Sequence, residues 1–287
     1  LTPVTGKKLV EFEETNGIHS LIATGINPAA FLRQCVREAE SQKNPSSIYL
    51  FFETIEGYHF VTLDYLYNKN PKHKFVYDMA MITPADPGNV AQLQNMIQKI
   101  NFNTDVDLLA GQMGGQFNSQ TYSLDPLSKT FRTSTYTYAN NFTESKYVNR
   151  TLNKDVEKSL FSKPTATRFI FTDAHRRDVD YIKTNDPQTD QTFRRRQNFM
   201  DRERAVMRQY SSIRLTISVP GNSNVTAGDT AMIVIPTNSD ATEEVMLNDK
   251  LYSGKYVITA VAHNVLSNGD YATVMELLRP GYEEKAV

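Results

Sequence analysis

Histidine, cysteine and carboxylate side chains are the groups in this sequence that could do acid–base, nucleophilic or metal chemistry. The five histidines lie at positions 19, 59, 73, 175 and 263, without the i, i+4 helical pair of a zinc protease. The segment Asp173-Ala174-His175 could supply two metal ligands, but its polar surroundings favour a surface loop. No Gly-x-Ser-x-Gly nucleophile elbow is present. The sequence therefore predicts no catalytic residues, no metal site and no cofactor, and so a protein that is not an enzyme.

Three other features favour structural over chemical roles. Cys35 is the single cysteine, and it lies on the apolar stripe of a predicted helix, which favours a small buried side chain over a nucleophile. The glycine-rich stretch 111–115 is not followed by Gly-Lys-Ser/Thr, so we expect it to let the backbone bend rather than cradle phosphate. His59 and His263 fall within predicted strands, where we expect structural histidines.

An arginine-rich segment is the most strongly charged feature of the chain. Between residues 191 and 210, six arginines exceed the two acids by four. One interpretation is a helix that contacts phosphates, and the other is a helix that pairs with acids of a neighbouring chain. The near-neutral chain and its acidic loop at 240–249 favour the second. The candidate subunit-interface residues are Arg194, Arg195, Arg196, Arg202, Arg204, Arg208, Asp240, Glu243, Glu244 and Asp249.

Composition sets the class of protein in which these residues must be positioned. The chain has 287 residues, enough for about two domains, and a net charge of −1 argues against a whole-chain nucleic-acid binder. A hydrophobic content of 40% excludes the disordered class, and no apolar run reaches the ~18–20 residues of a membrane-spanning helix. Fifteen Tyr and fifteen Phe favour strands. We expect a soluble, globular, disulfide-free protein.

The N-terminal third predicts a small α/β unit. The sequence begins at Leu1 without a methionine, so we expect a piece of a longer protein. A strand at 8–12 is followed by a helix that begins at Asn27-Pro28 and ends before Asn44-Pro45. A hairpin at 48–63 turns at Gly57, and a strand is expected at 75–82. The first predicted domain therefore covers residues 1–84.

The rest of the chain predicts a split β-barrel. A linker at 83–88 precedes a helix at 89–100 and two strands at 121–124 and 130–138. The polar stretch 140–190 contains one strand candidate, 168–171, and is expected to be an insertion. Four strands then follow, at 213–219, 230–235, 256–262 and 272–278. We therefore expect an α+β, β-rich fold in which an antiparallel barrel (85–140 and 205–287) is interrupted by the insertion and the Arg-rich helix (141–204).

The C-terminal strands resemble a known family. The segments Asn224–Asp229, Met232–Pro236, Leu251–Thr259 and Tyr271–Leu277, with His263 between the last two, look like a phage tail-hub barrel. Upstream, Phe52–Phe60 resembles the hairpin of these hubs. Three further segments resemble the entry to the second barrel of these hubs: Gly115–Asn118, Leu124–Pro126 and Thr130-Phe131. The family is that of the central baseplate or tail hub proteins of contractile-tailed, T-even-like bacteriophages, and the resemblance covers about residues 20–140 and 193–282.

The resemblance implies a structural virion protein in the tail baseplate, assembled in the host cytoplasm. Hubs of this family are trimers with two similar barrels per chain, whose ring of six continues the tail tube; here only one barrel is legible. It implies as partners other copies of itself, the tail spike, tail tube or tube-initiator proteins and other baseplate proteins, with DNA passing through the lumen without specific binding. A hub of a related contractile injection machine, a tail-associated cell-wall hydrolase and a module binding nucleic acid through its Arg-rich helix are the alternatives.

Overall fold

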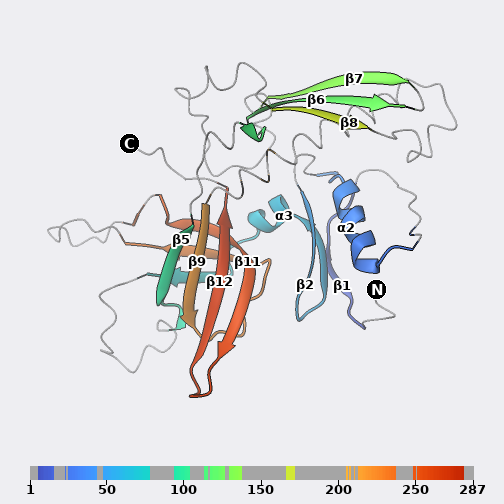
Figure 1. The fold of residues 1–287 in the computed structure, drawn as a ribbon. Coiled ribbons are helices and arrows are strands. Elements are labelled where there is room, and N and C mark those ends of the chain that lie inside the picture. Colours follow the sequence, from blue (N-terminus) through green and yellow to red (C-terminus); the bar gives the residue numbers. More distant parts are fainter. Residues whose placement is uncertain are drawn as a thin grey trace. The chain divides into compact units, whose positions relative to one another are not determined.

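The structure of the protein is a computed structural model. The described residues are 6–15, 23, 25–43, 48–77, 94–103, 113–115, 117–126, 129–137, 166–171, 205, 207, 210, 213–236, 248–249 and 251–280. Three sheets and few helices make up this part of the chain, which confirms the α+β, β-rich class (Figure 1). None of its helices is long and apolar enough to cross a membrane.

The first sheet contains the N-terminal strand and the predicted hairpin. Its order is β1-β3-β2, with β1 at Leu9–Phe12, β2 at Tyr49–Glu53 and β3 at Tyr58–Thr62. β2 and β3 pair antiparallel, whereas β1 lies parallel to β3. Helix α2, Pro28–Glu38, begins as predicted, because the Asn27 side chain accepts a hydrogen bond from Ala29 N at 2.9 Å. Helix α3, Leu63–Asn68, follows β3 directly.

A buried carboxylate fixes the chain after β1. Glu13 is only 4% exposed, and it accepts hydrogen bonds from Ser41 Oγ (2.6 Å), Thr62 Oγ1 (2.6 Å) and Thr62 N (3.1 Å). The Tyr49 hydroxyl donates to the carbonyl of Glu14 at 2.9 Å. Burial raises the pKa of Tyr49 to about 12 against the opposing Ser41 hydrogen bond, and the Glu13 charge adds to the rise. These groups are satisfied within the sheet.

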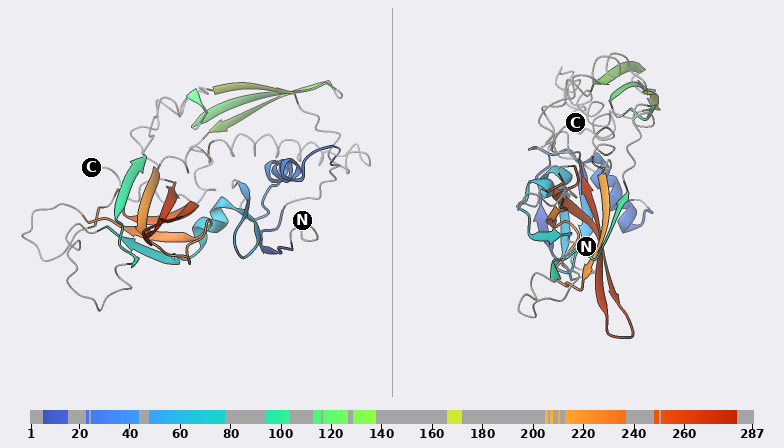
Figure 2. Two further views of the ribbon diagram at one scale, coloured as in Figure 1. Left: turned by 60° about the horizontal axis from the view of Figure 1, so that its bottom comes forward. Right: turned by 90° about the vertical axis from the view of Figure 1, so that its left-hand side faces the viewer.

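The second sheet is the curled, barrel-like body that the C-terminal sequence predicts. Its order is β4-β10-β11-β12-β9-β5. The bounds are His73–Val76 for β4, Lys99–Asn103 for β5, Ile213–Pro220 for β9, Thr230–Val234 for β10, Gly254–Val265 for β11 and Tyr271–Arg279 for β12. All pairings are antiparallel except that of β4 with β10. Figures 1 and 2 show the curl.

Alternation along the strands places one apolar face inside this curl. On β9, Ile213, Leu215, Ile217 and Val219 are each 0% exposed, while the residues between them are exposed or half-buried. They share one core cluster with Phe75 of β4 and with apolar residues of β10, β11 and β12. The segment before β5 brings the two ends of the sheet together.

Hydrogen bonds at that segment show how closely the curl approaches closure. Val76 N donates to Asn95 O (3.1 Å), and Ile97 N donates to Val76 O (2.9 Å), which attaches the segment to β4. Gln98 N then donates to Ser218 O of β9 at 2.8 Å. The same short stretch is therefore bonded to strands from both ends of the sheet.

The third sheet shares no strand with this curl. It has the order β7-β6-β8, with β6 at Asn118–Asp125, β7 at Thr130–Thr137 and β8 at Ala166–Phe171. β6 pairs antiparallel with β7 and parallel with β8. The strand predicted at 168–171 is thus confirmed, and it belongs to a sheet with β6 and β7.

Three expectations about strand placement are wrong. The strand near Phe75 pairs with β10 and does not extend the N-terminal α/β unit, because the buried Phe75 side chain joins the second core. β6 and β7 pair with β8 instead of completing the barrel. Lys99 and Ile100, placed at the end of a helix, form β5 because their backbone pairs with β9. The division into domains stays a prediction.

Candidate assembly surfaces

The long strand β11 has an edge that other described strands only partly cover. β11 runs from Gly254 to Val265, but β10 pairs only with its first part, Gly254 to Val257. Two further hydrogen bonds, Gly228 N to Ile258 O (2.8 Å) and Ile258 N to Asp229 O (2.9 Å), extend the cover by one residue. Within the described residues, no strand pairs with the outer edge of β11 from Ala260 to Val265.

The backbone groups that face outward along this edge can be assigned from the turn. Leu266 N donates to Asp270 O at 2.8 Å, so these two residues form a hydrogen-bonded pair at the end of the hairpin. Hydrogen-bonded and non-bonded pairs alternate in antiparallel strands. Asn264 and Ala262 therefore bond inward to β12, and the N–H and C=O groups of Val261, His263 and Val265 point away from it.

The side chains along this edge offer little protection against strand pairing. The stretch Ala260–Val265 contains no lysine, no proline and no acidic residue. Val265 is 72% exposed and Leu266 is 59% exposed. Exposed edges of monomeric sheets are usually blunted by charge, proline or a bulge, and here the only irregularity is a register shift before Ala260. The edge is suited to pairing with another strand.

A glycine and a tyrosine fix the base of the hairpin turn. Gly221 N donates to Tyr271 O at 2.8 Å, and any Cβ at Gly221 would fall on the Tyr271 ring. The Tyr271 hydroxyl lies 3.0 Å from His263 Nδ1 on the neighbouring strand. His263 therefore lies in a strand as predicted and has a structural contact.

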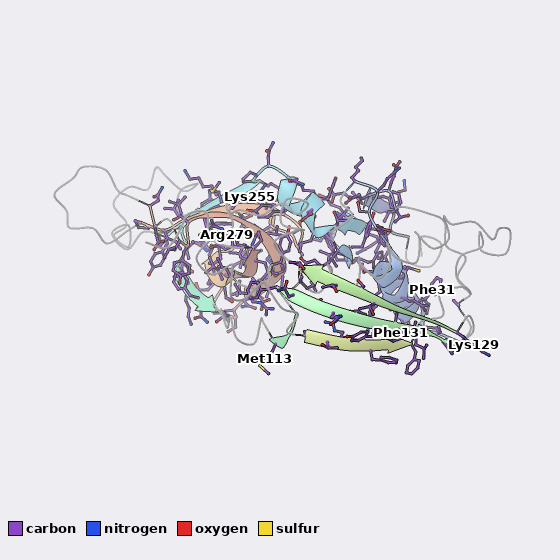
Figure 3. All side chains as sticks on the ribbon, turned by 90° about the horizontal axis from the view of Figure 1, so that it is seen from above. Phe31, Met113, Lys129, Phe131, Lys255 and Arg279 are labelled. Carbon is purple, nitrogen blue, oxygen red and sulfur yellow. The ribbon has the colours of Figure 1, made fainter. Side chains whose placement is uncertain are left out.

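A buried arginine supports the inner end of the same strand pair (Figure 3). Arg279 is 0% exposed, and its Nη1 donates to Ser253 O at 2.6 Å. Its Cζ lies 5.5 Å from the centroid of the Tyr256 ring. Gly254 has φ +143°, and a Cβ there would lie 2.7 Å from Arg279 Nη1, so only glycine fits. The positive φ expected at Gly254 is confirmed.

Asp229 joins the beginning of β4 to that of β10. Its carboxylate accepts hydrogen bonds from His73 Nε2 (3.1 Å), Lys72 Nζ (3.1 Å) and Thr226 N (3.2 Å). Burial alone would raise the pKa of Asp229, but the bonds from His73, Lys72 and Thr226 outweigh it and lower the pKa to about 2. The carboxylate is a charged anchor.

One arrangement in the first sheet has the geometry of a proton relay. His59 Nδ1 lies 3.0 Å from Glu11 Oε2, and His59 Nε2 lies 2.8 Å from Thr54 Oγ1. Phe52 stacks on the imidazole at 4.8 Å, and His59 is 7% exposed. The same order of carboxylate, imidazole and hydroxyl activates a nucleophile in hydrolases. The three residues also link β1, β3 and the hairpin turn, which is sufficient reason for a buried histidine.

Of the ten residues predicted to form a charged interface, nine lie outside the described residues. These nine are the six arginines, Asp240, Glu243 and Glu244. Asp249 is described, and its Oδ1 accepts hydrogen bonds from Leu251 N (2.7 Å) and Tyr252 N (3.1 Å). It therefore holds its own turn, and its role at an interface stays a prediction. Among the described residues, no group of three or more His, Cys, Asp or Glu side chains could hold a metal ion.

Sequence reasoning missed the free edge of β11. The predicted strand ended at Ala262, and the fact that β11 is more than twice as long as β10 emerges only from the pairing. The signal that could have indicated it is that the run from Val257 to Ala262 is followed, after His263 and Asn264, by Val265 and Leu266 before the Asn268-Gly269 turn.

Comparisons with known proteins give a distant structural likeness. No protein family model matches the chain, and no curated protein matches its sequence. Among solved structures, the chain is similar to the tail protein from Neisseria meningitidis MC58, with a TM-score of 0.39 and 9% sequence identity. The match covers 82% of this chain and 50% of that one, so the chain spans about half the length of the tail protein. A likeness of this size carries no argument about function.

Proposed function

We propose that this protein is a structural component of a phage tail: a trimeric baseplate hub that joins the tail tube to the central spike. On this proposal it forms part of the conduit through which DNA passes, without binding DNA specifically and without catalysing a reaction. Its partners are two further copies of itself, the tail spike, the tail tube or its initiator, and other baseplate proteins. The sequence resemblance of the C-terminal strands and their curled sheet support this function.

The free edge of β11 is the observation that carries the proposal. A ring of identical subunits needs a surface on each copy that the next copy completes. The outward N–H and C=O groups of Val261, His263 and Val265 provide such a surface, because a strand of the neighbouring copy can pair with them. On this proposal, pairing across subunits continues the sheet from one chain into the next.

The experiment removes one outward donor without disturbing the hairpin. Val265→Pro deletes an N–H that points away from β12, at a side chain that is 72% exposed. Val265→Thr keeps the N–H and the branched shape, and serves as the matched control. Light scattering after size exclusion should give the mass of three chains for the wild type and the control, and a smaller mass for Val265→Pro. A wild-type monomer at micromolar concentration contradicts the proposal.

A cell-wall hydrolase is the second candidate, because of the Glu11–His59–Thr54 arrangement. Its threonine hydroxyl lies 2.8 Å from the imidazole, within reach for proton transfer. Thr54→Val would remove the hydroxyl and keep the shape. If the structural proposal is right, neither wild type nor variant clears a zymogram containing peptidoglycan. Clearing by the wild type that Thr54→Val abolishes supports the hydrolase instead. A hub of a related contractile injection machine would behave like the phage hub in these tests.

A further inference from the structure

The β7-β6-β8 sheet has most of its aromatic residues on one face, and Tyr136 alone of the aromatic residues in its strands lies on the other. In its register, Tyr122 lies opposite Phe169, and Leu124 lies opposite both Phe131 and Phe171. Residues directly opposite one another on paired strands point to the same side of a sheet. One face therefore carries Tyr122, Leu124, Phe131, Phe169 and Phe171, and we call these five residues the aromatic face.

The rings of the aromatic face are exposed and in contact with one another. The exposed fractions of Phe131, Phe169 and Phe171 are 57%, 56% and 70%. Ring centroids lie 5.7 Å apart for Tyr122 and Phe131, 6.5 Å for Phe131 and Phe169, and 5.2 Å for Phe169 and Phe171. Figure 3 shows Phe131 and Lys129 at the same end of this sheet. The apolar surface is continuous across all three strands.

The opposite face of the same sheet is largely buried and mixes small polar side chains with apolar ones, among them Tyr136 and Ile170. Ser119, Thr121 and Ser123 of β6 are 2%, 1% and 0% exposed, and Ser134 of β7 is 8% exposed. Thr121, Ser123 and Ser134 all have interaction partners. A sheet that folds only for its own chain normally buries its apolar face and exposes its polar one. Here three aromatic rings lie on the exposed face, and exposed apolar surface of this kind marks interaction sites.

We propose that the aromatic face packs against another copy of this chain. This inference rests on the proposed function, which supplies several copies in one assembly. The other residues on this side of the sheet are Asn118, Gln120, Thr133, Thr135, Thr137 and Thr167, so none of its eleven described residues is charged. An uncharged face can meet a second copy without bringing like charges together. It also lacks the cations that a nucleic acid or an anionic surface requires.

The size and composition of the face fit the apolar core of a protein interface. Aromatic side chains bury ~150–250 Å² each, so three rings that are more than half exposed offer roughly 350 Å². A standard interface buries ~800 Å² per partner, with aromatic residues at its centre and polar residues around them. The face therefore supplies the centre of the contact, and the threonines and further surface supply its rim.

The test compares two triple variants of the full chain. Phe131→Ser, Phe169→Ser and Phe171→Ser together remove the rings, while Leu9→Ser, Phe12→Ser and Ile55→Ser remove three apolar side chains that are 50%, 56% and 81% exposed on the first sheet. Sedimentation velocity over a concentration series should show that the first variant weakens assembly at least 100-fold and that the second leaves it unchanged. Circular dichroism of both variants should match the wild type.

A second measurement needs no variant and so does not depend on folding. Hydroxyl-radical footprinting of the wild type should label Phe131, Phe169 and Phe171 several-fold less above the dissociation constant of the assembly than below it, with Ile55 equally labelled in both. Equal labelling of the three rings in both states, or a ring-free variant that assembles like the wild type, overturns the inference.

The outcomes also separate this inference from the proposed function. A three-copy assembly that survives loss of the rings refutes the aromatic contact and leaves the hub proposal intact. A two-copy assembly that is lost with the rings supports the aromatic contact and refutes the trimer. A wild type that stays monomeric at micromolar concentration refutes both.

Discussion

The six-stranded sheet and the β7-β6-β8 sheet follow the same two-residue alternation with opposite results. On β9 the alternate residues from Ile213 to Val219 are apolar and fully buried. On β6 the alternate residues from Ser119 to Ser123 are about as buried, but they are polar, and Tyr122 and Leu124 lie on the other side. Alternation thus defines two faces of each strand, and the neighbours of the sheet decide which face is buried.

The two sheets differ in the apolar surface whose burial stabilises them. Burying apolar surface contributes about 25 cal/mol per Å², so the closed cluster of the curled sheet stabilises the single chain. In the smaller sheet, the exposed rings can contribute comparable burial only when another molecule covers them. The core of the six-stranded sheet is therefore expected to govern folding, and the aromatic face of the β7-β6-β8 sheet is expected to act in association, together with the edge of β11.

Truncation in the core of the six-stranded sheet should have the largest effect. Leu277 of β12 is 0% exposed within the apolar cluster, so Leu277→Ala should lower the free energy of unfolding by about 2–5 kcal/mol. Urea unfolding followed by circular dichroism measures this. Leu278→Ala, at the neighbouring and partly exposed position, is the control and should cost about half as much or less. Equal costs at the two positions contradict the one-sided core.

A side chain at Gly254 should be nearly as damaging. Gly254→Val combines a φ of +143° with a Cβ 2.7 Å from the buried guanidinium of Arg279, and we expect a loss of more than about 2 kcal/mol. Gly269→Val is the matched control, because Gly269 has φ +89° and a Cβ there would meet nothing within 4 Å. The difference between the two melting curves isolates the clash from the backbone strain. No difference would mean that Arg279 moves aside freely.

The sequence predicts the strands better than it predicts their partners. The four C-terminal strands, the hairpin at Gly57 and the helix that begins after Asn27 all follow from local patterns of alternation, turn residues and caps. Each residue of β4 pairs with a residue 158 positions further along the chain, as Phe75 does with Ile233, and no local pattern near Phe75 specifies that partner. The partner of β8 is equally hard to predict, because β8 pairs in parallel with β6 although a long polar stretch separates the two strands in the sequence.

The candidate surfaces were less predictable than the fold. Charge counts led to the Arg-rich segment, because a run of one charge is visible in a sequence. The free edge of β11 depends on how far β10 extends beside it, and the exposure of Phe169 and Phe171 depends on which side of β8 is covered. Both depend on tertiary packing, which alternation alone cannot reveal.

The anchor at Asp229 should make the curled sheet sensitive to acid. The pKa of its carboxyl is about 2 in the folded chain and ~3.9 when unfolded, so the stabilisation is complete above about pH 4 and is lost as the pH falls towards 2. Asp229→Asn should lower the free energy of unfolding by about 1–2 kcal/mol at pH 7 and by much less at pH 2. Chemical unfolding at the two pH values measures this. A variant whose loss is the same at both values would show that the charge of Asp229 is not what stabilises the contact.

Removal of one ring from the aromatic face should have the smallest effect on the single chain. Phe171 is 70% exposed, and its ring makes an edge-to-face contact with Phe169 at a centroid distance of 5.2 Å. Phe171→Ser gives up that contact, worth ~0.5–1.5 kcal/mol, but it also removes exposed apolar surface from water. We expect the free energy of unfolding, measured by urea at a concentration where the chains are dissociated, to change by about 0.5 kcal/mol or less. A loss of ~2 kcal/mol or more would place Phe171 in the chain's own core, and the contrast between the two sheets would then be wrong. A small loss in the dissociated chain together with weaker assembly is the result that assigns the ring to association.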